Sequence, residues 1–169
     1  MGWDYLEQGD MAQADILCDL AWQAMRRNPA FNPVGSPSIF VHLGTVRLAQ
    51  QKYAEAETLL REGLRLAEKH DLDADYRLTV MNFLGASLAG QKKYADAEPL
   101  LLQSSRGLQL RQASLPPYLN ASRRIPESLE RLVQLYDAWG KPAQATEWKQ
   151  KLAEFQQAAN ADANKGQKP

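Results

Sequence analysis

The sequence predicts an all-α protein built as a stack of antiparallel helix hairpins, and three observations support this prediction. Leu and Ala occur 24 times each among the 169 residues, whereas Val, Ile and Thr together occur 12 times, which favours helices over strands. Apolar residues within 40–46 and 59–67 recur at helical spacing instead of alternating. A short motif also returns four times, with starts 42, 41 and 48 residues apart, and this period fits a helix-turn-helix unit.

The repeated motif reads DMAQADILC from residue 10, KYAEAETLL from residue 52, KYADAEPLL from residue 93 and KPAQATEWK from residue 141. Each copy has a small residue at the same position: Ala14, Ala56, Ala97 and Ala145. Two antiparallel helices can cross closely only where the side chains between them are small. We therefore expect the four alanines to lie at the helix crossings within the hairpins.

Three glycines fall inside the predicted helices, namely Gly44, Gly63 and Gly85. A glycine in a helix interior costs roughly 1 kcal/mol relative to alanine, so each of the three needs a packing reason. The simplest reason is the close approach of a neighbouring helix.

The repeats resemble the tetratricopeptide repeat family, whose pattern is W-x-x-L-G-x-x-Y followed by A-x-x-x-F. The first half appears as Phe40-x-x-Leu43-Gly44 and Met81-x-x-Leu84-Gly85, and the second half as Ala56-x-x-x-Leu60 and Ala97-x-x-x-Leu101. The last unit departs from the pattern, with Val133 in place of the glycine and Lys149 in place of the large apolar residue.

The longer spacing and the Tyr-Ala-Glu/Asp-Ala-Glu strings at Tyr53 and Tyr94 are most similar to the kinesin-light-chain type of repeat. That type is found in bacterial proteins and in the C-terminal regions of bacterial Ser/Thr kinases. The resemblance implies a right-handed superhelical stack, an α-solenoid, of about four hairpins with the first one truncated.

The breakers in the sequence divide the chain into units. We expect one helical domain over 1–159, with units at approximately 1–28, 37–70, 75–113 and 126–159. Residues 160–169 have few apolar side chains and are predicted to be a disordered polar tail. The connection over 113–125 is an ordinary lengthened loop or a docking loop, and Pro126 is expected at an early helical position.

Composition argues against several classes of function. Twenty basic and twenty acidic residues cancel, so no basic field favours nucleic acid, and no apolar run is long enough to span a membrane. One cysteine and two histidines do not form a recognisable metal site, and Cys18, His42 and His70 are interpreted as structural or surface residues. Since nucleotide-binding and hydrolase motifs are also lacking, we expect a cytoplasmic protein that is not an enzyme and needs no cofactor.

The resemblance further implies that the front helix of each hairpin lines a concave groove that binds protein. The positions that match this face are Val41, Thr45, Leu48, Thr79, Asn82, Ala86, Glu130, Gln134 and Asp137. Asn82 is the residue expected to pair with the backbone of an extended peptide, since an amide both donates and accepts. The acidic residues of the fourth unit would suit a ligand with Lys or Arg.

Two functions stay open at this point. The first is a non-catalytic interaction module that binds a peptide or protein segment in the groove. The alternative is a C-terminal regulatory or scaffolding fragment of a larger bacterial signalling protein, such as a Ser/Thr protein kinase. The truncated first hairpin would also allow self-association, because its second helix would keep apolar surface uncovered.

Overall fold

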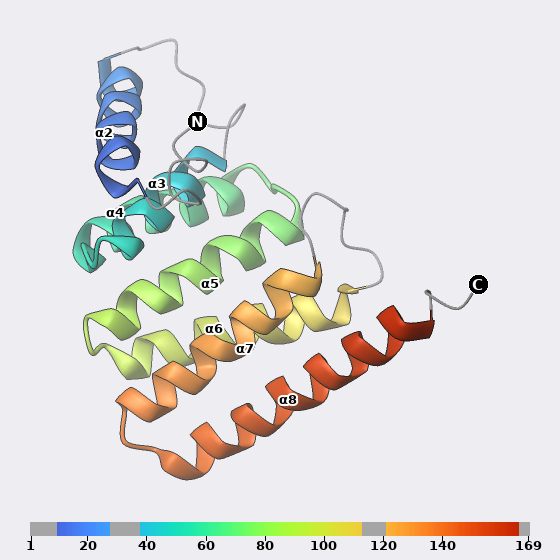
Figure 1. The fold of residues 1–169 in the computed structure, drawn as a ribbon. Coiled ribbons are helices and arrows are strands. Elements are labelled where there is room, and N and C mark those ends of the chain that lie inside the picture. Colours follow the sequence, from blue (N-terminus) through green and yellow to red (C-terminus); the bar gives the residue numbers. More distant parts are fainter. Residues whose placement is uncertain (1–9, 28–37, 113–120, 166–169) are drawn as a thin grey trace.

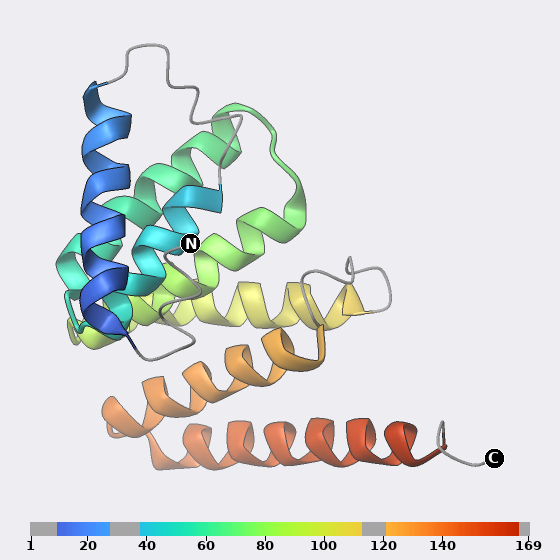
Figure 2. The same ribbon diagram turned by 45° about the horizontal axis from the view of Figure 1, so that its top comes forward.

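The computed structural model describes residues 10–27, 38–112 and 121–165, and every regular element within these ranges is helical (Figure 1). The longer helices are α2 (Met11–Arg27), α3 (Ser38–Ala49), α4 (Tyr53–Lys69), α5 (Ala74–Gly90), α6 (Tyr94–Leu110), α7 (Ala121–Ala138) and α8 (Pro142–Lys165). Successive helices pair as the hairpins α3/α4, α5/α6 and α7/α8, each packed on the next (Figures 1 and 2). The all-α stack of antiparallel hairpins is confirmed.

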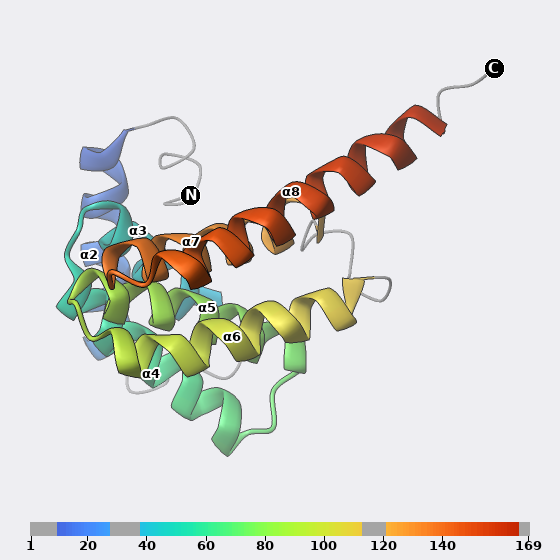
Figure 3. The same cartoon turned by 90° about the horizontal axis from the view of Figure 1, so that it is seen from below.

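The stack has two rows of helices. The front helices α3, α5 and α7 contact one another in chain order, and the back helices α4 and α6 each also contact the front helix that follows (Figure 3). Helix α2 stands steeply across one end and packs through Ala14, Ala21 and Trp22 against α3 and α4 (Figures 1 and 2). On its other side it exposes Ile16 and Leu20. The predicted front helix of the first unit falls on residues 1–9, outside the described residues.

The four aligned alanines lie where the sequence predicts them, in the interior of the stack. Ala14, Ala56 and Ala97 are 0% exposed and Ala145 is 1% exposed. The last three belong to one continuous apolar core that runs from α3 to α8. A methyl group at these positions therefore sets how closely the helices approach.

The glycines within the helices have the packing reason that the sequence requires. A Cβ at Gly85 would lie 2.6 Å from Leu101 Cγ, and a Cβ at Gly44 would lie 2.7 Å from Leu60 Cγ. Both leucines are 0% exposed, so neither can move away without disturbing the core. A Cβ added at Gly63 would likewise lie 2.9 Å from the Cβ of Phe40.

Each hairpin turn uses a residue with positive φ at the same place in the repeat. The φ angles are 60° at Gln51, 62° at Lys92 and 73° at Gly140. The amide of the next residue then donates to the carbonyl five positions earlier, as Lys93 N does to Leu88 O at 2.9 Å. This bond satisfies a carbonyl at the end of the front helix and turns the chain into the back helix.

A carboxylate near the start of α4, and another near the start of α6, joins one unit to the next. Glu57 Oε2 accepts hydrogen bonds from Lys93 Nζ at 2.9 Å and Gln91 Nε2 at 2.7 Å, both in the turn of the following unit. Glu98, one repeat later, accepts a hydrogen bond from Tyr136 Oη at 2.7 Å and lies 3.8 Å from Lys141 Nζ. The same junction is therefore built twice with different partners.

Two helix boundaries differ from the expected units. Helix α7 begins at Ala121 and contains Pro126 within it. Ile125, just before the proline, is buried, and its burial stabilises the helical turn that precedes Pro126. Helix α8 continues to Lys165, into the segment expected to be disordered, since adding a residue to an existing helix avoids the cost of nucleation. Residues 166–169 lie outside the described part of the chain.

Replacing Ala97 by leucine tests the helix crossing. The added side chain has no space between α5 and α6, so Ala97→Leu should lower the free energy of unfolding by roughly 1–3 kcal/mol. The matched control is Ala95→Leu on the exposed side of the same helix, which should leave stability within about 0.5 kcal/mol. Urea denaturation measures both, and equal midpoints for the two variants would contradict the assigned crossing.

The junction at Glu57 predicts a dependence of stability on pH. The hydrogen bond from Lys93, opposed by burial and aided by Arg61, lowers the pKa of Glu57 from 4.5 to about 2. A carboxylate with a lowered pKa in the folded state stabilises above its unfolded pKa and loses this contribution as the pH falls. Between about pH 5 and pH 2 the wild type should therefore lose more unfolding free energy than Glu57→Gln.

The control for this measurement is Glu68→Gln, which removes the same charge from an exposed position of α4. Its stability should follow the pH dependence of the wild type. Parallel curves for the wild type and Glu57→Gln would show that the junction carboxylate is not held in its ionised form.

Candidate functional site

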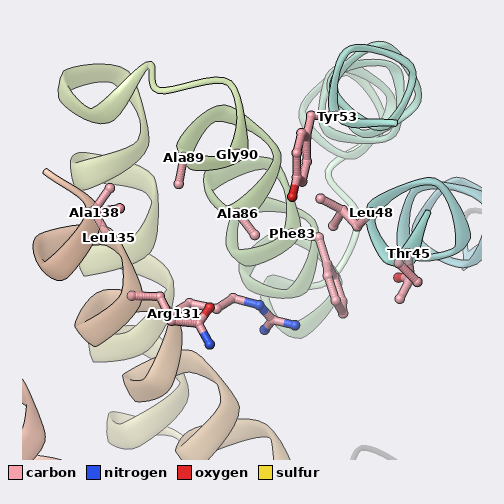
Figure 4. A pocket seen from close by; sticks show the side chains of 12 residues that line it. Thr45, Leu48, Tyr53, Phe83, Ala86, Ala89, Gly90, Arg131, Leu135 and Ala138 are labelled. Atoms are coloured by element: carbon pink, nitrogen blue, oxygen red, sulfur yellow. The ribbon is translucent and has the colours of Figure 1, made fainter. Parts of the chain in front are cut away.

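The three front helices enclose a cavity of about 450 Å³, the front cavity, which is open to solvent (Figure 4). Its lining comes from α3, the start of α4, α5 and α7. The lining residues are Thr45, Leu48, Ala49, Tyr53, Phe83, Ala86, Ala89, Gly90, Arg131, Gln134, Leu135 and Ala138. The cavity thus spans all three hairpins of the stack.

Small residues on α5 leave the space that forms the front cavity. Ala86, Ala89 and Gly90 follow one side of the helix, and the ring of Tyr53 lies against Gly90 (Figure 4). A Cβ at Gly90 would overlap that ring. Leu48 and Phe83 supply a larger apolar surface next to this space. The lining can accept an apolar side chain by the hydrophobic effect.

Arg131 gives the front cavity a positive charge. Its Nη1 donates a hydrogen bond to Asn82 Oδ1, and its Cζ lies 4.5 Å above the centroid of the Phe83 ring (Figure 4). Stacking on the ring and pairing with the amide hold the guanidinium in place. Burial lowers the pKa of Arg131, and the charge of Glu127 offsets this lowering in part.

The acidic residues of α7 do not line the cavity. Glu127 accepts a hydrogen bond from Arg123 at 2.7 Å, and Asp137 forms an ion pair with Lys149 of α8 at 3.0 Å. The sequence led us to expect an acidic end of the groove. The charged side chain among the lining residues is instead Arg131.

Four of the nine residues predicted for the groove line the front cavity, namely Thr45, Leu48, Ala86 and Gln134. Val41 and Thr79 lie on front helices but are buried within the stack. Glu130 and Asp137 are exposed on α7 and do not line the cavity.

Asn82 lies in the interior, where it is 3% exposed. Its Nδ2 donates to Ser104 Oγ of α6 at 3.0 Å, and its Oδ1 accepts the bond from Arg131. The amide thus pairs with both neighbouring helices of its own chain, which differs from the predicted pairing with a peptide backbone. A peptide could reach this amide only after displacing Arg131.

The residues predicted for the groove did not include Phe83, Tyr53 and Arg131, which also line the cavity. The helical spacing of residues in the sequence could have identified Phe83 and Arg131. Positions 83, 86 and 90 on α5, and 131, 134 and 138 on α7, each follow i, i+3, i+7 and face the same side.

The residues considered for catalysis are placed apart from the cavity. His42 is exposed on α3, and His70 is the residue that follows the last turn of α4. Cys18 belongs to α2, but its side chain is outside the described part of the structure. Within the described residues, no three His, Cys, Asp or Glu side chains are grouped so as to hold a metal ion.

None of the described helices is both long and apolar enough to cross a membrane.

Comparisons with known proteins agree with this architecture. Residues 36–109, which include the hairpins α3/α4 and α5/α6 up to the last turn of α6, match the family model of the tetratricopeptide repeat. The match confirms the tetratricopeptide repeats that the sequence predicts in this part of the chain.

The likeness of fold extends beyond these repeats. The crystal structure of BtubC (BKLC) from P. vanneervenii is similar with a TM-score of 0.50 at 15% sequence identity, over 92% of this chain and 77% of that chain. No curated protein matches the sequence. Tetratricopeptide repeats generally mediate contacts between proteins.

Proposed function

We propose that this chain is a non-catalytic interaction module that holds a peptide or protein segment of a partner on the face formed by α3, α5 and α7. The front cavity carries the proposal. It spans three successive front helices, and its lining is mostly apolar around one cation, Arg131. A segment lying across these helices would place one apolar side chain in the cavity and spread its other contacts along the stack.

The chemistry of the lining favours binding over catalysis. Arg131 and Tyr53 are its ionisable side chains, and it includes neither a carboxylate nor a histidine or cysteine. Histidine and carboxylate side chains are the most common general bases, and a nucleophile is usually activated by such a base beside it. Membership in a larger bacterial signalling protein would use the same surface, and that alternative stays a prediction.

Filling the cavity tests the proposal. The probes are end-blocked peptides with a central Phe or Leu between polar residues, compared with all-polar peptides of equal length. The protein carries ¹³C-labelled alanine methyl groups. Peptides with the apolar residue should shift the methyl signals of Ala86, Ala89 and Ala138, and Ala86→Phe should weaken binding about tenfold or more by occupying the cavity.

The matched control is Ala95→Phe, which adds the same ring to an exposed position outside the cavity. It should bind the peptides as the wild type does. Methyl shifts confined to other alanines, or unchanged binding by a folded Ala86→Phe variant, would contradict the proposal.

A further inference from the structure

Two arginines on α7 face α5 without an acidic partner. Arg131 contacts Asn82 and Phe83, and Nη1 of Arg124 lies 3.5 Å from Oγ1 of Thr79. In the part of the chain that the structure describes, neither guanidinium lies within 4.0 Å of a carboxylate oxygen. The two residues are seven positions apart, so they lie on the same side of α7 about 10 Å from each other along the axis.

Arg124 and Arg131 are half-buried, whereas Arg47, the buried arginine among the described residues, has acidic partners. Arg47 is 7% exposed and forms ion pairs with Asp19 and with Glu55, the latter at 3.0 Å. Its charge is compensated within the chain. The acidic residues of α7 do not pair with Arg124 or Arg131, because Glu127 bonds to Arg123, Asp137 bonds to Lys149 and Glu130 is exposed.

Burial without an ion pair makes these cations costly. Burial is the main cause that lowers the pKa of both Arg124 and Arg131, and the charge of Glu127, which is not paired with either, offsets it only in part. A carboxylate brought to such a site interacts more strongly than it would with an arginine in water, because water screens the attraction less. The desolvation free energy of the arginine is part of the folding free energy, so binding of the carboxylate does not add it again.

We propose that the segment bound in the front cavity carries an acidic side chain beside its apolar one, and that this carboxylate pairs with Arg131 under the added attraction of Arg124. This inference rests on the proposed function and specifies the chemistry of the partner. It reverses the charge that the sequence suggested, since a basic ligand would be repelled by both arginines.

The geometry of Arg131 suits this role. A guanidinium has five N–H donors in a planar fork, and one nitrogen of Arg131 is bonded to Asn82. Stacking on Phe83 fixes the plane, so the remaining donors can meet a carboxylate in a bidentate manner with little loss of side-chain freedom. The apolar lining around Leu48 and Ala86 would hold the neighbouring side chain of the partner.

Three end-blocked peptides test the inference. Each has a central Phe, flanked by two Glu, two Gln or two Lys residues, so that charge comes from side chains alone. The peptide with Glu should bind about tenfold more tightly than the peptide with Gln, and the peptide with Lys should bind most weakly. Raising the salt concentration should reduce the advantage of the Glu peptide.

Substitutions then locate the charge. Arg131→Met keeps an unbranched apolar side chain but removes the guanidinium and its charge, and should abolish the tenfold preference while the Gln peptide binds as before. Arg106→Gln, which removes an exposed charge from the back helix α6, is the matched control and should keep the preference. Gln134→Lys adds a positive charge at an exposed position of the lining, so it should strengthen binding of the Glu peptide about threefold without disturbing the core.

Several results would overturn the inference. Equal binding of the three peptides in the cavity, or an unchanged preference in folded Arg131→Met, would remove the acidic requirement but leave the interaction module intact. Tighter binding of a Gln peptide with a free C-terminus than of the blocked Glu peptide would reassign the carboxylate to a chain end. Failure of every peptide to reach the cavity would overturn both proposals.

Discussion

The close contact between small and large residues at each helix crossing is the constraint on which the other features depend. The buried methyl groups of Ala56, Ala97 and Ala145 bring paired helices together, and Gly44 and Gly85 make room for the leucine of the opposite helix. Because the interior is close-packed, this spacing is nearly fixed. The spacing in turn sets the distance between front helices, and the front cavity is the volume that their small side chains leave open.

A polar chain connects the front of the stack with its back row. Ser104 of α6 accepts a hydrogen bond from Asn82 of α5, which accepts one from Arg131 of α7. Ser128 and Ser105 form a second buried link between α7 and α6, at 3.1 Å. Hydrogen bonds of this kind are directional, whereas apolar contacts are not, so they specify how α7 is rotated on its neighbours. The orientation of Arg131 toward the cavity follows from that rotation.

The repeat could be predicted from the sequence because it depends on local chemistry. The alanine spacing and the glycines report helix crossings directly, and the structure confirms them. The candidate site was harder to predict. Whether Asn82 points outward or inward depends on the rotation of α5 between two neighbours, and the pairing of Asp137 with Lys149 depends on where α8 packs. A long arginine side chain adds a further difficulty, since its charge lies far from its backbone position.

The junctions between units are insensitive to how much chain separates them. Glu57 meets Lys93, and Glu98 lies near Lys141, although the repeat starts are 41 residues apart in the first case and 48 in the second. The greater sequence length of the link between α6 and α7 therefore leaves this junction in place, because the entropic cost of closing a loop grows only slowly with its length. That link is the natural place to graft a reporter or a second domain into the protein by design.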